Sequence, residues 1–275
     1  MTSMAHGQGV AVSSGSLRAL LRNRTTARVL SVLIAILGWQ FVAPLLPTDL
    51  IPAPLAVLEF MWDEIRGDTL GRTTVYQAFF ISLSRLFTGL AAAFVIGVPL
   101  GIAMGFWKPV NNFFSDFVVV GLAMPSLVWA LLTGVWFGLG NAAPIITVFL
   151  AALPYYMLNS AEGVRSVPTD LVEMGKAFDV TRGDRMRHVV LPSLMPFMFA
   201  SLRYGLGNGW KGLVLAEVFA ATNGAGWNIR YWYDAHRATG VFGYALFFVL
   251  FALLVERFAF QALSRRVFRW RGDDD

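Results

Sequence analysis

Six apolar stretches, each close to the length that crosses a lipid bilayer, divide this 275-residue chain. A membrane-spanning α-helix needs about 20 mostly apolar residues. The composition agrees, because 56% of the residues are hydrophobic, only 14% are charged and the mean hydropathy is +0.60. We therefore expect an all-α, polytopic membrane protein with about six transmembrane helices. The expected spans are Val29–Leu46, Ala78–Phe106, Phe113–Gly138, Ala142–Ser160, Leu194–Ala221 and Val241–Ser264.

The basic residues set the expected orientation of these spans. Cytoplasmic segments of membrane proteins are enriched in Lys and Arg, so both termini should be cytoplasmic. The excess of 22 basic over 17 acidic residues fits such loops, and we expect no nucleic-acid partner. The expected parts are a partly disordered N-terminal tail (1–28), a membrane domain (29–264) and a C-terminal tail (265–275). The inner set is Arg18, Arg22, Arg24, Arg28, Lys108, Arg165, Lys176, Arg182, Arg185, Arg187, Arg265, Arg266, Arg269 and Arg271; the outer set is Arg66, Arg72, Arg230 and Arg237.

The segment 47–77, between the first two spans, carries five acids and two arginines, which suits the outer side. After the chain breaker Ile51–Pro54, apolar residues recur at helical spacing. This pattern favours a short amphipathic surface helix over a solvated loop. The residues of its apolar face would be Val57, Leu58, Met61 and Ile65.

Prolines interrupt three of the expected spans, at Pro99, Pro125 and Pro154. Glycines accompany the first of them, in the run 97–105. In lipid, prolines and small residues permit kinks and close helix contacts. We therefore interpret these positions as packing features rather than as a ligand site.

Residues 168–192, which we call the polar insert, are too polar to cross a membrane and separate the fourth and fifth spans. Asp170, followed three residues later by Glu173, predicts the start of a helix by side-chain capping. Gly175 lowers helix stability by about 1 kcal/mol relative to Ala, so its presence suggests that something packs closely there. The helix would present one apolar face, made of Leu171, Met174 and Phe178.

A second helix of the polar insert should follow a turn at Asp179 and Val180. Thr181 and Asp184 predict a second capping box, and Pro192 should end this helix after Val189. The apolar face of the first helix could rest on the bilayer, on the spans of the same chain, or in a partner's groove. Physical reasoning alone leaves these three alternatives open.

Five residues of the polar insert follow the pattern Glu-Ala-Ala, three residues, Gly, nine residues, Ile-x-Leu-Pro: Glu173, Gly175, Val189, Leu191 and Pro192. With this pattern, the insert resembles the signature of ABC importer permeases. Met174 and Gly175 stand where the signature has alanines, and Asp179 stands at its central glycine. Aspartate tolerates the left-handed backbone conformation better than most residues, so the turn can be retained.

Further stretches, in order over residues 30–270, make the chain similar to sulfonate, taurine and nitrate importer permeases. The resemblance implies the type I ABC importer permease fold, in a bacterial cell inner membrane. It also implies a homodimer around a central pathway, cytoplasmic ABC ATPase subunits and an extracytoplasmic solute-binding protein. These further stretches are 51–57, 82–85, 97–105, 158–165, 187–192, 215–217 and 224–229. The residues expected to couple to the ATPase are Leu171, Glu173, Met174, Gly175, Phe178, Asp179, Leu191 and Pro192.

No chemistry of an enzyme is visible in the sequence. It has no G-x-x-x-x-G-K-[ST] phosphate loop, and the glycines at 205–209 lie in an apolar span without a preceding strand. The chain has no cysteine, and its three histidines are scattered. We therefore expect no catalytic residues, no metal site and no cofactor, with ATP hydrolysed on a separate chain.

Charged residues inside the expected spans are the candidates for a translocation pathway, because a charge at mid-membrane costs about 2.5–3.5 kcal/mol. Arg203 and Lys211, with Asn208 and Glu217, could face a pathway for a small anionic solute. The alternative is an internal ion pair with Glu217 or with an acid of a neighbouring span. A secondary transporter driven by an ion gradient is the alternative function, but no inverted repeat supports it, and Glu217 is the only plausible acid in mid-span.

Overall fold

The computed structural model describes residues 24–45, 50–68, 71 and 73–260, and these residues form helices without any β-strand. The expected tails, apart from residues 24–28 of the first, and the end of the sixth expected span lie outside the described residues. The α-helices are α2 (Arg24–Val42), α3 (Pro54–Arg66), α4 (Val75–Phe106), α5 (Lys108–Ala123), α6 (Ser126–Phe137), α7 (Ala142–Arg165), α8 (Thr169–Ala177), α9 (Arg182–Arg185), α10 (Leu191–Ala220), α11 (Ala225–Asp234) and α12 (Ala238–Leu254). A 3₁₀ turn η1 (Ala43–Leu45) and two π-helical segments, η2 (Met186–Val190) and η3 (Val255–Phe260), extend three of them.

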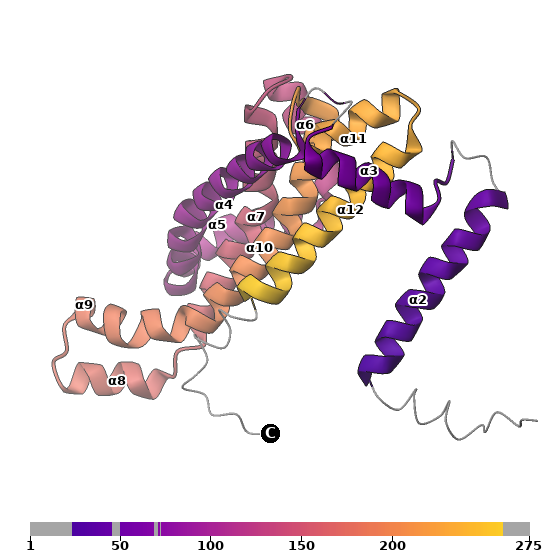
Figure 1. Cartoon of the computed structure of the whole chain (residues 1–275). Helices are drawn as coiled ribbons and strands as arrows, with labels where there is room; N and C mark the ends of the chain where they lie inside the picture. Colours follow the sequence, from indigo (N-terminus) through magenta and orange to yellow (C-terminus); the bar gives the residue numbers. More distant parts are fainter. Residues whose placement is uncertain (1–23, 46–49, 69–70, 72, 261–275) are drawn as a thin grey trace, which may run out of the picture.

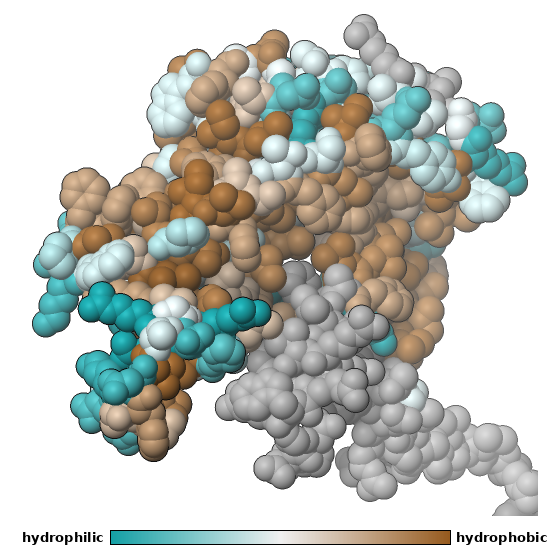
Figure 2. Space-filling model, turned by 90° about the vertical axis from the view of Figure 1, so that its left-hand side faces the viewer, coloured by the Kyte–Doolittle hydropathy of each residue, from teal (hydrophilic) through white to brown (hydrophobic). Residues whose placement is uncertain are grey.

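Four described helices are long and apolar enough to cross a membrane. They are Val75–Phe106, Ala142–Arg165, Arg182–Ala220 and Ala238–Phe258. The bent pair α5–α6 adds a fifth span if counted as one, and Val29–Leu45 is a shorter apolar helix. Figure 2 shows a broad apolar band across the middle of one face, with hydrophilic residues gathered above and below it. The all-α, polytopic membrane architecture expected from the sequence is therefore confirmed, although four or five spans among the described residues meet the length and hydropathy requirements where about six were expected.

Helices α4, α7 and α10 form the centre of the bundle, and small residues bring α4 against α7 (Figure 1). A Cβ atom added at Gly89, Gly97, Gly101 or Gly105 would lie 2.3–2.8 Å from an atom of α7. These glycines recur every fourth or eighth residue, so they share one face of α4. The interpretation of the 97–105 glycines as packing residues is confirmed.

The prolines have unequal effects on the spans. Pro99 and Pro154 remain inside the continuous helices α4 and α7. Pro125 instead separates α5 from α6, whose axes meet at 104°. Since proline disfavours helical geometry in the residue before it, Met124 adopts an extended conformation and the chain turns there. The third expected span is therefore two short helices that meet at a sharp bend, not one continuous helix.

The short helix expected after Ile51–Pro54 is present as α3. It buries Val57 and Met61, but Leu58 and Ile65 are exposed, so its buried face differs from the expected one. Glu64 completes that face, because its carboxylate accepts a hydrogen bond of 2.8 Å from the Tyr244 hydroxyl of α12. A buried polar bond, which the apolar pattern could not reveal, thus fixes the rotation of α3.

Helix α2 stands apart from the bundle in Figure 1 and contacts it mainly near its C-terminal end. Trp39 donates a hydrogen bond of 3.0 Å to the Pro52 carbonyl oxygen and lies against the ring of Phe242. The apolar side chains of α2 are mostly exposed. Lipid or another protein surface must therefore cover this helix.

Candidate functional site

The polar insert forms a helical hairpin that projects beyond one end of the bundle (Figure 1). Its first arm, α8, begins after Pro168, and no side chain caps it. The expected cap by Asp170 is therefore wrong. Asp170 lies inside the first turn instead, where its charge still meets the positive end of the helix dipole.

The turn between the two arms is built around Asp179, which has a φ of 53°. The Val180 N–H donates to the Gly175 carbonyl (2.9 Å), and the Asp179 N–H donates to the Lys176 carbonyl (3.1 Å). These two bonds make a Schellman motif, in which glycine usually takes the left-handed position. The prediction that aspartate can hold this turn in place of glycine is confirmed.

Two substitutions at Asp179 should distinguish the need for a positive φ at this position from any contribution of the aspartate side chain. Asp179→Gly should change stability by less than about 1 kcal/mol, because glycine adopts positive φ freely but gains entropy when unfolded. Asp179→Val should destabilise the turn by about 1–2 kcal/mol, since a β-branched residue is strained there. Hydrogen exchange of the α8 amides would measure this, and equal exchange rates in the two variants would contradict the strain argument.

The second arm of the hairpin continues into the membrane without a break. Thr181 caps it, because its hydroxyl oxygen accepts from the Asp184 N–H at 3.1 Å, as expected. The expected end at Pro192 is wrong, since α9, η2 and α10 form one helix, Arg182–Ala220. The Leu191 N–H donates to the Met186 carbonyl, five residues earlier, which is π-helical geometry. The helix therefore continues through Pro192, although proline has no N–H to donate.

The apolar face of α8 is exposed. Leu171, Met174 and Phe178 expose 40%, 52% and 77% of their surface. Glu173 is exposed beside them. The chain's own spans therefore do not cover this face, which removes one of the three alternatives that the sequence left open.

Gly175 lies on the inner side of α8, where it is buried. A Cβ atom at this position would lie 2.9 Å from Cδ of Arg185, whose side chain crosses α8 at this point. The expected close contact at Gly175 is therefore present, and it joins the two arms of the hairpin. Leu191 and Pro192 are exposed at the base of the second arm, where α10 begins.

The four pathway candidates occupy different environments. Arg203 and Lys211 are exposed on α10, and Asn208 between them is half-buried. Arg203 forms an ion pair with Glu256 of η3, an acid of a neighbouring span. Glu217 is completely buried. Arg203, Asn208 and Lys211 are thus at least partly accessible, whereas Glu217 is enclosed.

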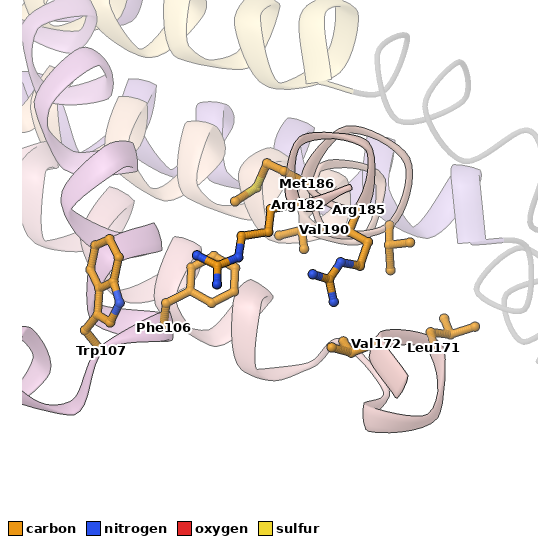
Figure 3. A pocket seen from close by; sticks show the side chains of 9 residues that line it. Phe106, Trp107, Leu171, Val172, Arg182, Arg185, Met186 and Val190 are labelled. Carbon is orange, nitrogen blue, oxygen red and sulfur yellow. The ribbon is translucent and has the colours of Figure 1, made fainter. Parts of the chain in front are cut away.

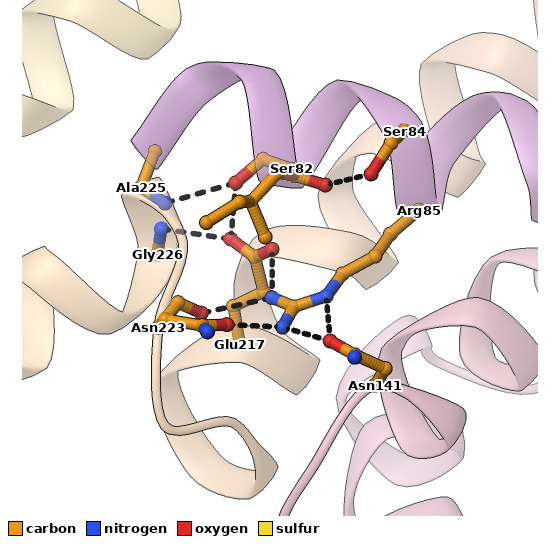
Figure 4. Close-up of polar contacts among 9 residues, drawn as sticks. Ser82, Ser84, Arg85, Asn141, Glu217, Asn223, Ala225 and Gly226 are labelled. Carbon is orange, nitrogen blue, oxygen red and sulfur yellow. Dashed lines mark hydrogen bonds and ion pairs between the residues drawn. The ribbon is translucent and has the colours of Figure 1, made fainter. Parts of the chain in front are cut away.

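Glu217 belongs to a buried polar cluster centred on Arg85 of α4 (Figure 4). The two side chains form an ion pair of 2.7 Å and are 0% and 3% exposed. The other guanidinium hydrogens go to the side-chain oxygen of Asn141 and to the side-chain and backbone oxygens of Asn223. Ser82 donates to the second carboxylate oxygen at 2.7 Å. The buried charges are therefore fully hydrogen-bonded, as their stability requires.

The same cluster shapes the turn that leads into α11. The Gly226 N–H donates to the Glu217 carboxylate and the Ala225 N–H to the Ser82 hydroxyl, each at 2.9 Å. Gly224 has a φ of 109°, and a Cβ atom there would lie 2.5 Å from Oε1 of Glu217. Only glycine fits both conditions. The cluster thus holds together α4, α10, α11 and the start of α7 at the end of the bundle opposite the polar insert.

Sequence reasoning singled out Ser82–Arg85, Leu215–Glu217 and the 224–229 turn as separate stretches, but it did not bring them together. Asn141 and Asn223 were missed entirely, because a single asparagine in a loop carries no pattern. No group of His, Cys, Asp or Glu among the described residues could hold a metal ion.

Comparison with known proteins decides the family. Residues 97–269 match the family described as binding-protein-dependent transport system inner membrane component. The chain belongs to this family. It is a membrane-spanning transport permease and is not itself an enzyme, and the resemblance found in the sequence is confirmed.

Two curated relatives extend the match over nearly the whole permease. A putative ABC transporter permease protein of Methanocaldococcus jannaschii is 28% identical over 270 residues, 98% of each chain. The taurine transport system permease protein of Escherichia coli is 29% identical over 249 residues, 90% of this chain and 89% of the relative.

A solved structure supports the fold. An inward-facing form of the MetNI methionine ABC transporter matches with a TM-score of 0.61 and 21% identity, covering 70% of this chain and 95% of that chain. At this identity the match concerns the fold alone, and it confirms the type I importer permease architecture.

Proposed function

We propose that this permease imports a small anionic solute and is driven by separate ABC ATPase subunits that dock on the polar insert. The observation that carries the proposal is the exposed apolar face of α8, the first arm of a hairpin that projects beyond the bundle. Burying each such side chain contributes about 1.5–3 kcal/mol. An amphipathic helix laid into a groove of a partner is the binding mode that such a face fits.

The solute class is inferred from the relatives and from α10. The similar proteins include permeases of taurine, nitrate and bicarbonate transport systems. Lys211 is exposed on α10, and no ion pair among the described residues includes it. Lys211 offers positive charge and, with Asn208, hydrogen-bond donors to an anion; Arg203, whose charge is paired with Glu256, adds N–H donors beside them. We assign these three residues to the pathway and Glu217 to the structural cluster.

A second copy of the chain is the proposed partner across this pathway, with an extracytoplasmic binding protein delivering the solute. The exposed apolar surface of α2 supports the dimer, since a helix so loosely attached to its own bundle can pack on a neighbouring copy. The basic residues of the polar insert support its placement in the cytoplasm, with both termini on that side of the cell inner membrane.

The docking proposal predicts the outcome of co-purification. A tagged chain isolated in detergent from its native host should retain a Walker-motif ATPase, and Met174→Ala/Phe178→Ala should lower its recovery at least tenfold. The reason is the loss of two apolar contacts of about 1.5–3 kcal/mol each. Glu173→Ala, a change of exposed charge on the same helix, should weaken recovery further when combined with them.

Tyr233→Ala is the matched control, because Tyr233 is a 71% exposed aromatic residue on α11, at the opposite end of the bundle. Its ATPase recovery should equal that of the wild type. Docking at the polar insert is ruled out if the control and the double variant lose the ATPase equally. If no ATPase accompanies the wild type, and the chain alone moves solute down an ion gradient in liposomes, the protein is a secondary transporter.

A further inference from the structure

A hollow of about 350 Å³ lies between the polar insert and the end of α4 (Figure 3). Its volume falls within the range of about 300–1,000 Å³ that is usual for ligand pockets. Apolar side chains from three elements form most of its wall. The lining residues are Phe106, Trp107, Leu171, Val172, Arg182, Arg185, Met186, Val189 and Val190.

Two guanidinium groups enter this apolar hollow. Figure 3 shows the side chains of Arg182 and Arg185 extending into the space between Phe106 and Val172. None of the ion pairs among the described residues includes either arginine. The nearest acid in sequence, Asp184, accepts instead from the Thr181 hydroxyl at 2.7 Å. The hollow therefore combines apolar walls with two positive charges that no acid among the described residues pairs with.

The hollow also lies where a membrane surface is expected. Phe106 is the last residue of the apolar helix α4, and Trp107 and Lys108 follow it directly. Tryptophan is enriched at the boundary between hydrocarbon and headgroups, and lysine reaches toward the headgroups. An occupant of the hollow would thus meet acyl chains on one side and headgroups on the other.

We propose that this hollow binds an anionic phospholipid of the cytoplasmic leaflet, with its phosphate on Arg182 and Arg185 and its acyl chains on Phe106, Trp107 and Val190. Basic pockets beside membrane-spanning helices on the cytoplasmic side bind the headgroups of anionic lipids. Arginine suits phosphate because its planar fork donates two parallel hydrogen bonds. The inference rests on the cytoplasmic placement of the polar insert in the proposed function.

The lipid site and the proposed ATPase surface share only Leu171 among the apolar residues of the exposed α8 face. Met174 and Phe178, the most exposed apolar residues of α8, are absent from the lining of the hollow. The hairpin therefore has two surfaces, one facing away from the bundle and one facing the end of α4. Arg185 connects them, because its aliphatic part packs on Gly175 while its guanidinium enters the hollow. A bound lipid would fix the angle at which the hairpin leaves the membrane.

Native mass spectrometry of the full chain, purified in detergent with its bound subunits and titrated with phosphatidylglycerol, tests the proposal. The wild type should retain this lipid in preference to phosphatidylcholine of the same acyl chains. Arg182→Gln/Arg185→Gln should lower its apparent affinity at least tenfold. Lys176→Gln/Arg187→Gln is the matched control, since it removes two exposed charges of the same insert outside the hollow. The control should retain the lipid.

Val189→Trp supplies a second variant that keeps both arginines but fills the hollow, and it should also lose the lipid. The proposal is overturned if both double variants bind phosphatidylglycerol alike, if phosphatidylcholine binds equally well, or if inorganic phosphate displaces the lipid. Release of the lipid whenever ATPase subunits bind would likewise overturn it, because the occupant would then be the ATPase. Absence of any ATPase from the purified wild type would count against the proposed function. The lipid titration would still show whether the hollow binds phosphatidylglycerol.

Discussion

Replacing Glu217 with leucine should destabilise the permease by about 3–5 kcal/mol, because the Arg85 charge would remain buried without its counter-ion. The change would also leave the Ser82 hydroxyl and the Gly226 N–H without their acceptor. For a chain of this size, we expect the apparent melting temperature in detergent to fall by about 10 °C. Size-exclusion chromatography after heating at graded temperatures would measure it.

A double variant distinguishes a missing counter-ion from a simple loss of contacts. Arg85→Met/Glu217→Leu should be less damaging than Glu217→Leu alone, since replacing a whole buried ion pair by apolar residues can be neutral. Asp234→Asn is the control, because Asp234 forms an exposed ion pair with Arg230. Such pairs contribute about 0–1 kcal/mol. A double variant as unstable as the sum of its two single variants would contradict the ion-pair argument.

This cluster marks the limit of what the sequence could predict. The lengths of the apolar stretches were enough for the membrane class and most span positions, because apolar length is a local property. The partners of Arg85 are 56 residues away at Asn141, 132 at Glu217 and 138 at Asn223. The packing of α4 against α7 and α10 brings them together. The sequence therefore identified Glu217 as a costly charge but could not show that it is enclosed rather than accessible.

The polar insert was more predictable, for the opposite reason. Its turn depends on residues within six positions, so the left-handed Asp179 and the Thr181 cap followed from local chemistry. The errors arose where a local rule has two solutions. A proline can end a helix or can follow a π-helical turn within it, and Pro192 follows such a turn. Likewise, a proline within a span can remain inside a continuous helix, as Pro99 does, or can separate two helices at a bend, as Pro125 does.

Gly101→Ala should destabilise the contact between α4 and α7 by about 2 kcal/mol or more, although alanine is the better helix former by about 1 kcal/mol. The added methyl carbon would lie 2.3 Å from the Met157 carbonyl oxygen and 2.7 Å from Cβ of Ser160. The first of these atoms belongs to the backbone of α7, so no side-chain rotation can make room. The two helices would have to separate along their whole contact.

Gly207→Ala is the matched control, because Gly207 lies inside α10 and no atom within 4 Å would meet its Cβ. There the helix propensity of alanine should act alone and raise stability by up to about 1 kcal/mol. The two substitutions are chemically identical, so opposite shifts of the apparent melting temperature would isolate the close approach of α4 and α7. Shifts of the same sign would show that α7 yields at Met157. In that case, the contact between α4 and α7 would accommodate an added methyl group at Gly101.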